Sequence, residues 1–204
     1  MKTQIKICGI KTEEEVQLVN HYPVAYIGLI FAKSKRQVSI EKAAYLRPLI
    51  RGDVQVVGVF MDQELDFVQE AIDHCGLDLV QLHGNESNDF IGKLSVPVWK
   101  SVAIKGRESL QVLGDYPQAK GLLLDTYHKG ATGGTGQQFN WDLVEDLDIP
   151  QKLILAGGLS PDNVIEAIDK VGPDILDLNS GLETDLIKDP KKVQALFEKL
   201  KNMA

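Results

Sequence analysis

Eight short apolar segments recur along this chain, and a polar turn and a stretch with helical spacing of apolar residues follow each one. They lie near residues 5–8, 25–31, 54–60, 78–82, 97–102, 120–125, 152–156 and 174–178. With 204 residues in total, each unit has about 25 residues, enough for a strand, a crossover helix and two short loops. Regular alternation of strands and helices predicts a parallel sheet.

Helix start signals support this division. Thr12 and Glu15 have the spacing of a capping box, in which two side chains satisfy the first free N–H groups of a helix. The pairs Ser160-Pro161 and Asp189-Pro190 place a capping residue before a proline at the first helical position. We therefore expect helices to begin at these three places.

Within the strands, polar residues alternate with apolar ones and gather at the carboxyl ends. Ile5 and Ile7 share one face, and Lys6 and Cys8 share the other. The same alternation separates Gln81, His83, Asp125, Asp177 and Asn179 from their apolar neighbours. In a closed barrel the outer face is apolar because helices cover it, whereas the upper interior opens into a site. The pattern thus predicts a single-domain (βα)8 TIM barrel of the α/β class.

An open, doubly wound sheet is the alternative architecture. Eight units favour closure, and the run Gly133-Gly134-Thr135-Gly136 lacks the spacing of a dinucleotide-binding loop and does not directly follow a strand. The hydrophobic content of 44% suffices for one sizeable core, and no linker divides the chain. We therefore expect one domain over residues 1–204.

Composition excludes several classes of partner. The net charge of −7 comes without a basic stripe, which argues against binding to nucleic acid. No apolar stretch approaches the roughly 20 residues that span a bilayer, and the opening Met-Lys-Thr-Gln leads straight into a strand. We expect a cytoplasmic protein with no membrane partner, with Cys8 and Cys75 reduced.

Two side chains at strand ends suggest proton-transfer chemistry. Cys8 closes the first strand and Asp125 closes the sixth, so a thiol and a carboxyl group can divide proton abstraction and donation between them. The runs Leu-Ala-Gly-Gly-Leu at 155–159 and Asn-Ser-Gly-Leu at 179–182 end two further strands. Their backbone N–H groups can surround a phosphate. Acid, base and anion site together suggest an isomerase of a sugar phosphate.

Taken singly, these residues also have structural explanations. A cysteine on a strand is usually a small core residue, and an aspartate at a strand end often caps a helix or anchors a loop. Most loop arginines, such as Arg36, are simply solvated. Asp177 can satisfy backbone groups. For Gln81 and His83 we rank a buried hydrogen-bond network first and lining of a substrate pocket second. The four histidines have no metal-ligand spacing, which predicts no metal site.

Eight short motifs, in register with the eight units, resemble the phosphoribosylanthranilate isomerase family of tryptophan biosynthesis. They are Lys6-Ile7-Cys8-Gly9, Ser34-Lys35-Arg36-Gln37-Val38, Val57-Gly58-Val59-Phe60, Gln81-Leu82-His83-Gly84, Leu124-Asp125-Thr126, Gly133-Gly134-Thr135-Gly136 with Phe139-Asn140-Trp141, Ala156-Gly157-Gly158-Leu159 and Asn179-Ser180-Gly181. The resemblance implies a (βα)8 barrel and a cofactor-free Amadori rearrangement of N-(5-phosphoribosyl)anthranilate to 1-(2-carboxyphenylamino)-1-deoxyribulose 5-phosphate.

The resemblance also implies a role for each candidate residue. Cys8 is the general base and Asp125 the general acid, whereas Arg36 and Asp177 bind the anthranilate part. Phosphate binding falls to Gly157, Gly158, Ser180 and Gly181. The loop 126–139 is expected to act as a lid, in which Gly134 and Thr135 add phosphate contacts. The substrate is a small phosphosugar, and a monomer and a homodimer both remain open.

These roles set opposite requirements on two pKa values. Asp125 must have a pKa above the free value of about 3.9 to donate a proton near neutral pH, which partial burial favours. Cys8 needs a shift toward the thiolate from about 8.5, and we expect Lys6 on the same strand face to assist it.

The sequence departs from the family pattern after Glu183. The family usually has a Pro-Gly pair there, whereas Thr184-Asp185-Leu186-Ile187 precedes Lys188 in this chain. The turn must therefore be built differently. Two other functions compete with the isomerase. Another phosphosugar isomerase or epimerase would keep the glycines but has less use for Arg36, and a non-catalytic phosphometabolite-binding barrel would leave Cys8 and Asp125 incidental.

Overall fold

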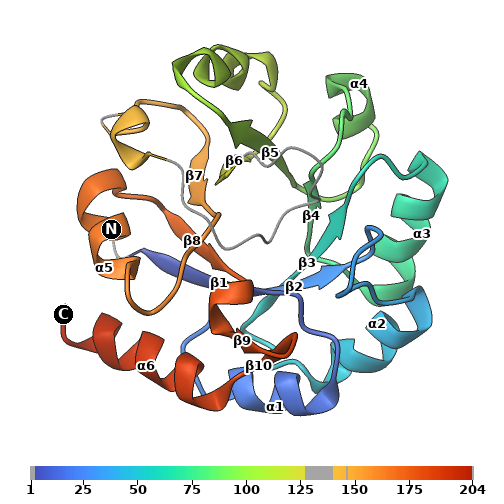
Figure 1. Cartoon of the computed structure of the whole chain (residues 1–204). Coiled ribbons are helices and arrows are strands. Elements are labelled where there is room, and N and C mark those ends of the chain that lie inside the picture. The colour runs from blue at the N-terminus through green and yellow to red at the C-terminus, as the bar shows by residue number, and fades with distance from the viewer. Residues whose placement is uncertain (1–2, 127–139, 146, 204) are drawn as a thin grey trace.

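Eight parallel strands close into a barrel (Figure 1) in the computed structural model, which describes residues 3–126, 140–145 and 147–203. Each strand pairs with the next, and β8 pairs with β1, so that Ile5 lies opposite Leu176. The strands are β1 (Gln4–Cys8), β2 (Tyr26–Ile30), β3 (Gln55–Phe60), β4 (Leu79–Leu82), β5 (Val98–Ile104), β6 (Gly121–Thr126), β7 (Lys152–Leu155) and β8 (Ile175–Leu178). The predicted (βα)8 barrel and all eight predicted strand positions are confirmed.

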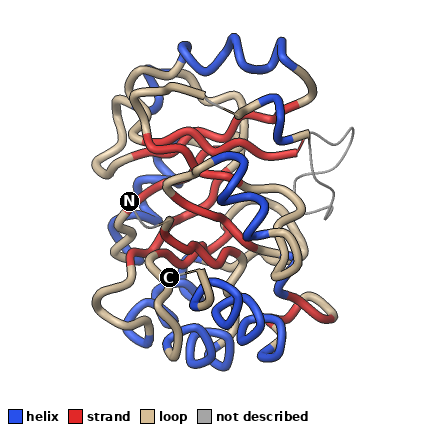
Figure 2. The backbone as a smooth tube through the Cα atoms, turned by 90° about the vertical axis from the view of Figure 1, so that its left-hand side faces the viewer, coloured by secondary structure: helices blue, strands red, loops and turns tan. Residues whose placement is uncertain are grey.

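Helices form the outer ring of the barrel (Figures 1 and 2). The α-helices are α1 (Glu13–Asn20), α2 (Ile40–Leu46), α3 (Leu65–Cys75), α4 (Asn88–Ile91), α5 (Val164–Val171) and α6 (Pro190–Lys201). Buried apolar residues such as Val68 and Ile72 of α3 and Val193 and Leu196 of α6 recur at spacings of three and four. No helix within the described ranges is long and apolar enough to cross a bilayer.

The remaining helical segments are 3-10 helices. They are η1 (Arg47–Leu49), η2 (Arg107–Asp115), η3 (Trp141–Leu143) and η4 (Ser180–Leu182). The connection after β5 therefore contains η2, and the described part of the connection after β6 contains η3, where the sequence pattern predicted full helices. In η2 only Leu113 is buried, and Leu110 packs beside it against the apolar cluster around β5 and β6.

Two of the three predicted helix starts are confirmed. Thr12 and Glu15 form the capping box of α1, and Asp189 caps α6 by accepting a hydrogen bond from the N–H of Lys191 at 2.9 Å. The third prediction was wrong, because α5 begins at Val164 with Asn163 as its N-cap. The Asn163 side chain accepts from the N–H of Ser160 and donates to the carbonyl of Gly158, so Ser160 belongs to a loop turn that precedes the helix.

An apolar floor fills the lower interior of the barrel. Trp99 of β5 meets Tyr26 of β2 in an edge-to-face contact with ring centroids 4.9 Å apart. Because β2 and β5 are not neighbours in the sheet, this contact crosses the interior. The cluster comprises Tyr26, Val57, Leu79, Trp99, Leu123, Ile154, Ala156 and Ile175. Polar groups in the barrel therefore lie above this apolar floor, toward the carboxyl ends of the strands.

A two-stranded hairpin replaces the turn that is usual after Glu183. Strands β9 (Glu183–Thr184) and β10 (Ile187–Lys188) pair antiparallel, with Lys188 opposite Glu183. Asp185 and Leu186 between them have φ values of 53° and 63°, as a two-residue type I′ turn requires. The hairpin thus brings Lys188 back beside Glu183. The sequence predicted a differently built turn here, and the structure has one.

Glu15 of α1 forms a hydrogen bond to this hairpin and contributes to the stability of the fold. Its side chain accepts from the N–H groups of Lys11 and Thr12 and, at 3.0 Å, from the buried N–H of Lys188. Glu15→Ala should lower the free energy of unfolding by about 2 to 4 kcal/mol, because it removes a cap and leaves a buried donor unpaired. Urea unfolding measures this, and Glu14→Ala on the exposed side of α1 should change it by no more than about 0.5 kcal/mol. Equal effects of the two substitutions would contradict the prediction.

Candidate functional site

A pocket of about 290 Å³ opens at the carboxyl ends of the barrel strands. Its lining comes from all eight strands or the loops that follow them, and nine predicted site residues take part: Cys8, Arg36, Gln81, His83, Asp125, Gly157, Gly158, Asp177 and Ser180. Closure of the sheet therefore brings together side chains that lie up to 172 positions apart (8 to 180). Gly134 and Thr135, the predicted lid residues, lie outside the described residues.

Cys8 ends β1 at the wall of this pocket. It is buried with Ile30 and Val59, and Gly28 on β2 leaves room for it, since a Cβ on Gly28 would lie 2.6 Å from the Cys8 sulfur. Burial raises the pKa of the Cys8 thiol, and the ammonium groups of Lys6 and Lys188 oppose this shift. The net shift is upward, so the expected shift toward the thiolate is not found.

Lys6 explains why the expected assistance is only partial. Its Nζ lies 2.6 Å from Oδ2 of Asp177, its neighbour across the β1–β8 pairing, and the Lys6 side chain is fully buried. The positive charge of Lys6 is thus shared between Asp177 and Cys8. Asp177 also adds its own negative charge near the thiol, which raises the pKa of Cys8 further. The Oδ1 atom of Asp177 is buried without a hydrogen-bonding partner in the described part of the chain, so it can accept a donor from a ligand.

Asp125 lies at the end of β6, also on the pocket wall. Its Oδ1 accepts a hydrogen bond from the N–H of Thr126 at 2.7 Å, which orients the carboxyl group. Gly157 on the neighbouring β7 loop packs against it, because a Cβ on Gly157 would lie 2.7 Å from the same oxygen. The positive φ of 85° at Gly157 also favours glycine. This glycine therefore serves both the turn and the space for the carboxyl group.

The two glycines after β7, Gly157 and Gly158, both line the pocket. Gly157 and Gly158 both have positive φ, and neither N–H donates to an acceptor within the described ranges. Successive unpaired N–H groups in such a turn form an anion-binding concavity. Ser180 lines the pocket from the neighbouring loop. Gly181 does not line it, because it packs against the carbonyl oxygen of Leu159, where a Cβ would clash.

Gln81 and His83 form a partly buried hydrogen bond with each other and also line the pocket, as the sequence suggested. The amide nitrogen of Gln81 lies 2.6 Å from Nε2 of His83, and both residues line the pocket. Burial, with Lys6 and Lys100 nearby, lowers the pKa of His83 to about 3. Although part of its surface faces the pocket, the ring is therefore neutral at neutral pH, and its Nε2 can accept the Gln81 hydrogen bond.

Arg36 reaches the pocket from the loop after β2, but its guanidinium is already engaged. Its Nε and Nη2 atoms donate to Glu183 at distances of 2.6 to 3.0 Å, which raises the pKa of Arg36. Glu183 and its second partner Lys188 were not among the sequence candidates. No turn signal such as Asn-Gly marks the hairpin that joins them, so only the departure from the family pattern at 184–187 pointed to this region.

A metal site has no support in this part of the molecule. The described residues contain no group of three or more histidine, cysteine, aspartate or glutamate side chains arranged to hold an ion. The pocket combines a thiol, the carboxyl groups of Asp125 and Asp177, and neutral or cationic hydrogen-bond donors. Such a set can bind an anionic molecule and move protons on it.

The chain is similar to known proteins over nearly its whole length. The sequence model described as N-(5'phosphoribosyl)anthranilate (PRA) isomerase matches residues 5–199. A relative from Citrifermentans bemidjiense, named N-(5'-phosphoribosyl)anthranilate isomerase, is 42% identical over 204 residues, which cover 99% of this chain and 98% of the relative.

Two solved structures are similar over nearly the whole chain. Phosphoribosyl anthranilate isomerase from Thermotoga maritima has a TM-score of 0.91 and 31% identity, with 98% of this chain and 99% of that chain covered. A second structure is a phosphoribosyl anthranilate isomerase in complex with reduced 1-(o-carboxyphenylamino)-1-deoxyribulose 5-phosphate. It has a TM-score of 0.85 and 29% identity, with 98% and 99% coverage.

The neutral state of His83 is open to direct measurement. Because its pKa lies near 3 in the fold and near 6.5 in an unfolded chain, its ring resonances should stay constant from pH 8 to pH 5. In urea they should titrate. NMR spectra of the wild type and of His83→Gln, which lacks the signal, identify the ring. The unfolded chain takes up a proton that the fold does not, so His83 also lowers stability as the pH falls below 6.5. A midpoint above pH 5 in the folded protein would contradict the assignment.

Proposed function

This chain belongs to the N-(5'-phosphoribosyl)anthranilate isomerase family and is an isomerase of tryptophan biosynthesis, and we propose that Cys8 and Asp125 carry out its proton transfers. The observation that carries this proposal is that both side chains line one pocket, beside an arginine and two glycine N–H groups that have no acceptor in the part of the chain that the structure describes. General acid and base groups are useful only where both can reach one bound substrate.

The reaction begins with one proton donation and one proton abstraction by the enzyme, and it involves no change of oxidation state overall. Asp125 donates a proton to the furanose ring oxygen as the bond from this oxygen to C1 breaks, which leaves an iminium between C1 and the anthranilate nitrogen. Cys8, as a thiolate, removes the proton on C2, and the electron pair moves into an enaminol. Protonation at C1 and loss of the hydroxyl proton at C2 then give 1-(2-carboxyphenylamino)-1-deoxyribulose 5-phosphate.

The surroundings of Cys8 bear on how the base forms. Its raised pKa means that only part of the enzyme carries the thiolate at neutral pH, but a thiolate with a high pKa is also the stronger base once formed. Lys6 and Lys188 act on the thiol in the favourable direction. The positive iminium of the bound intermediate adds to them, so deprotonation of Cys8 becomes easier when the substrate is in place.

The two ends of the substrate carry negative charge, and the pocket offers a suitable partner for each. At one side, the N–H groups of Gly157 and Gly158, with Ser180, receive the phosphate. At the other side, Arg36 faces the carboxylate of the anthranilate ring, and Oδ1 of Asp177 accepts the N–H of the anthranilate amine. The related enzyme that was solved with a reduced product analogue supports a ligand with these two charged ends.

Removal of either proton-transfer group should abolish most of the turnover. Cys8→Ser keeps the shape but replaces the thiol by a hydroxyl that does not ionise near neutral pH, and Asp125→Asn removes the acidic proton. We expect kcat to fall about 10² to 10⁴-fold in each variant. The assay follows the conversion of freshly generated phosphoribosylanthranilate.

Cys75→Ala is the matched control for the cysteine variant. Cys75 is the other cysteine of the chain and is buried on α3, away from the residues that line the pocket, so its loss should leave kcat within about twofold, although it costs some stability. If Cys8→Ser retained near wild-type turnover, Cys8 would not be the base. If Asp125→Asn did so, Asp125 would not be the acid.

A further inference from the structure

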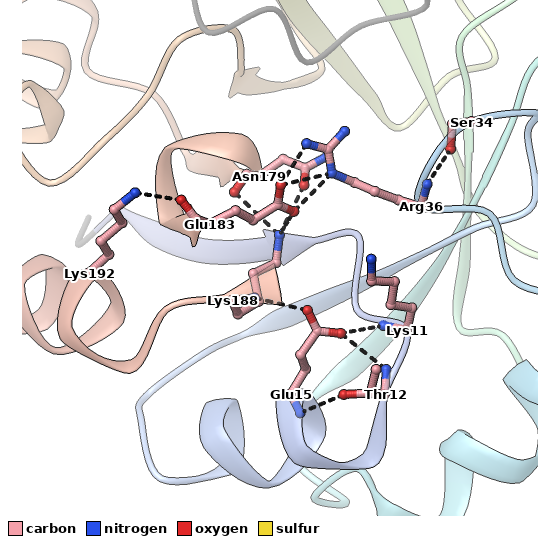
Figure 3. A network of polar contacts seen from close by, with 9 residues as sticks. All are labelled: Lys11, Thr12, Glu15, Ser34, Arg36, Asn179, Glu183, Lys188 and Lys192. Carbon is pink, nitrogen blue, oxygen red and sulfur yellow. Dashed lines mark hydrogen bonds and ion pairs between the residues drawn. The ribbon is translucent and has the colours of Figure 1, made fainter. Parts of the chain in front are cut away.

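Among the described residues, Arg36 uses one edge of its guanidinium for side-chain contacts. Nε and Nη2 both donate to the Glu183 carboxylate, and Nη1 has no hydrogen-bonding partner among the described residues. Figure 3 shows this edge-on pair, with Nη1 at the far side of the guanidinium from Glu183. A guanidinium has five N–H donors in a fixed plane, so the edge formed by Nη1 and Nη2 remains available for a second carboxylate.

The partner of Arg36 is itself held by a second cation. The Nζ of Lys188 lies 2.7 Å from Oε1 of Glu183 and also donates to Oδ1 and to the carbonyl oxygen of Asn179. These three acceptors match the three N–H donors of an ammonium group, whereas a neutral amine has only two. Burial lowers the pKa of Lys188, and Glu183 opposes that shift. The contacts therefore indicate a charged lysine.

Neither Glu183 nor Lys188 lines the pocket, in contrast to Arg36. The side chain of Lys188 is 0% exposed and that of Glu183 is 4% exposed. The cluster of these three residues thus has two positive charges and one negative charge, with the surplus positive charge on the side that faces the pocket. A buried Glu183 with Arg36 alone would form a neutral pair.

Several elements build this arrangement. The β9–β10 pairing sets Lys188 opposite Glu183, and Glu15 of α1 holds the N–H of Lys188 (Figure 3). Gly9 leaves room for the stem of Arg36, because a Cβ there would lie 2.9 Å from its Cδ. The side chain of Arg36 is thereby fixed before substrate arrives, and little rotamer freedom remains to be lost on binding.

We propose that Glu183 and Lys188 are positioning residues for substrate specificity, which hold Arg36 so that its free edge receives the anthranilate carboxylate. Glu183 sets the orientation of the guanidinium. Lys188 balances the charge of Glu183, so that Arg36 keeps its attraction for an anionic group. The inference rests on the proposed binding of the carboxylate by Arg36, and it assigns the selection of a carboxylated aminosugar to residues behind the pocket wall.

The test compares two stable ligands that differ by one group. The first is reduced 1-(2-carboxyphenylamino)-1-deoxyribulose 5-phosphate, and the second carries an unsubstituted phenyl ring in place of the carboxyphenyl ring. Calorimetry gives the dissociation constant of each, and their ratio is the carboxylate preference. In the wild type we expect a preference of at least about tenfold, which corresponds to about 1.4 kcal/mol.

Removal of Lys188 alone and removal of Lys188 together with the Glu183 charge should change the carboxylate preference in different ways. Lys188→Met leaves Glu183 to neutralise Arg36, so the preference should fall close to one, with the affinity for the phenyl ligand unchanged within about threefold. The double variant Glu183→Gln with Lys188→Met leaves Arg36 as the sole charge of the three. It should regain a several-fold preference relative to Lys188→Met. A merely structural role of Lys188 predicts no such recovery, because the double variant disturbs the fold at least as much.

Two further variants serve as controls. Lys192→Met removes a lysine that donates to the backbone carbonyl of Glu183 and not to its carboxylate, and it should keep the wild-type preference. Lys188→Arg retains the charge and should keep most of it, which also covers the case in which Lys188→Met fails to fold. Equal loss of affinity for both ligands in Lys188→Met, or no recovery in the double variant, would overturn the proposal.

Arg36→Met separates this inference from the proposed function. If Arg36→Met loses the preference while the Lys188 variants keep it, Arg36 binds the carboxylate and the positioning role is wrong. If Arg36→Met itself keeps the full preference, the assignment of Arg36 fails, and with it the positioning role. Loss of the preference in Arg36→Met and in Lys188→Met, with recovery in the double variant, supports both.

Discussion

The pairing of β8 with β1 is the contact on which the site depends. It closes the sheet and sets Lys6 opposite Asp177, two residues that are 171 positions apart in the chain. A buried ammonium or carboxylate alone would be very costly, but each compensates the other at 2.6 Å. This ion pair also acts electrostatically on Cys8, with Lys6 favouring the thiolate and Asp177 opposing it, so that barrel closure and the electrostatics of the proposed base have one origin.

Cationic side chains lie around the pocket although the protein has a negative net charge. The chain has a net charge of −7, yet Lys6, Arg36 and Lys188 all lie at or directly behind a pocket that we propose to bind a molecule with two anionic groups. Each of these cations has a buried carboxylate partner. Uncompensated cations would repel one another, and burial would favour the neutral form of the two lysines, whereas a carboxylate partner favours their charged form. The carboxylates thus maintain the positive groups of the site.

Much of the fold was predictable because its signals are local. The eight strands follow from runs of apolar, β-branched residues, and the alternation within them assigned Cys8, Asp125 and Asp177 correctly to the inner face. The helices expected after β5 and β6 were wrong in the described residues, where these connections contain the 3-10 helices η2 and η3. The start of α5 was misplaced because Ser160-Pro161 resembles a helix cap, whereas the N-cap is Asn163, three residues later, whose side chain closes the loop turn before the helix.

The sequence by itself determined the barrel, the face on which each polar residue lies and the gathering of the candidate groups at one end, because side-chain alternation and strand order are properties of the local chain. Only the tertiary structure decided the state of those groups. Burial raises the pKa of Cys8. Arg36 forms an ion pair with Glu183, and the β9–β10 hairpin places Lys188 beside the same carboxylate. Burial and long-range ion pairs depend on neighbours that are remote in sequence, and no local pattern in the chain encodes them.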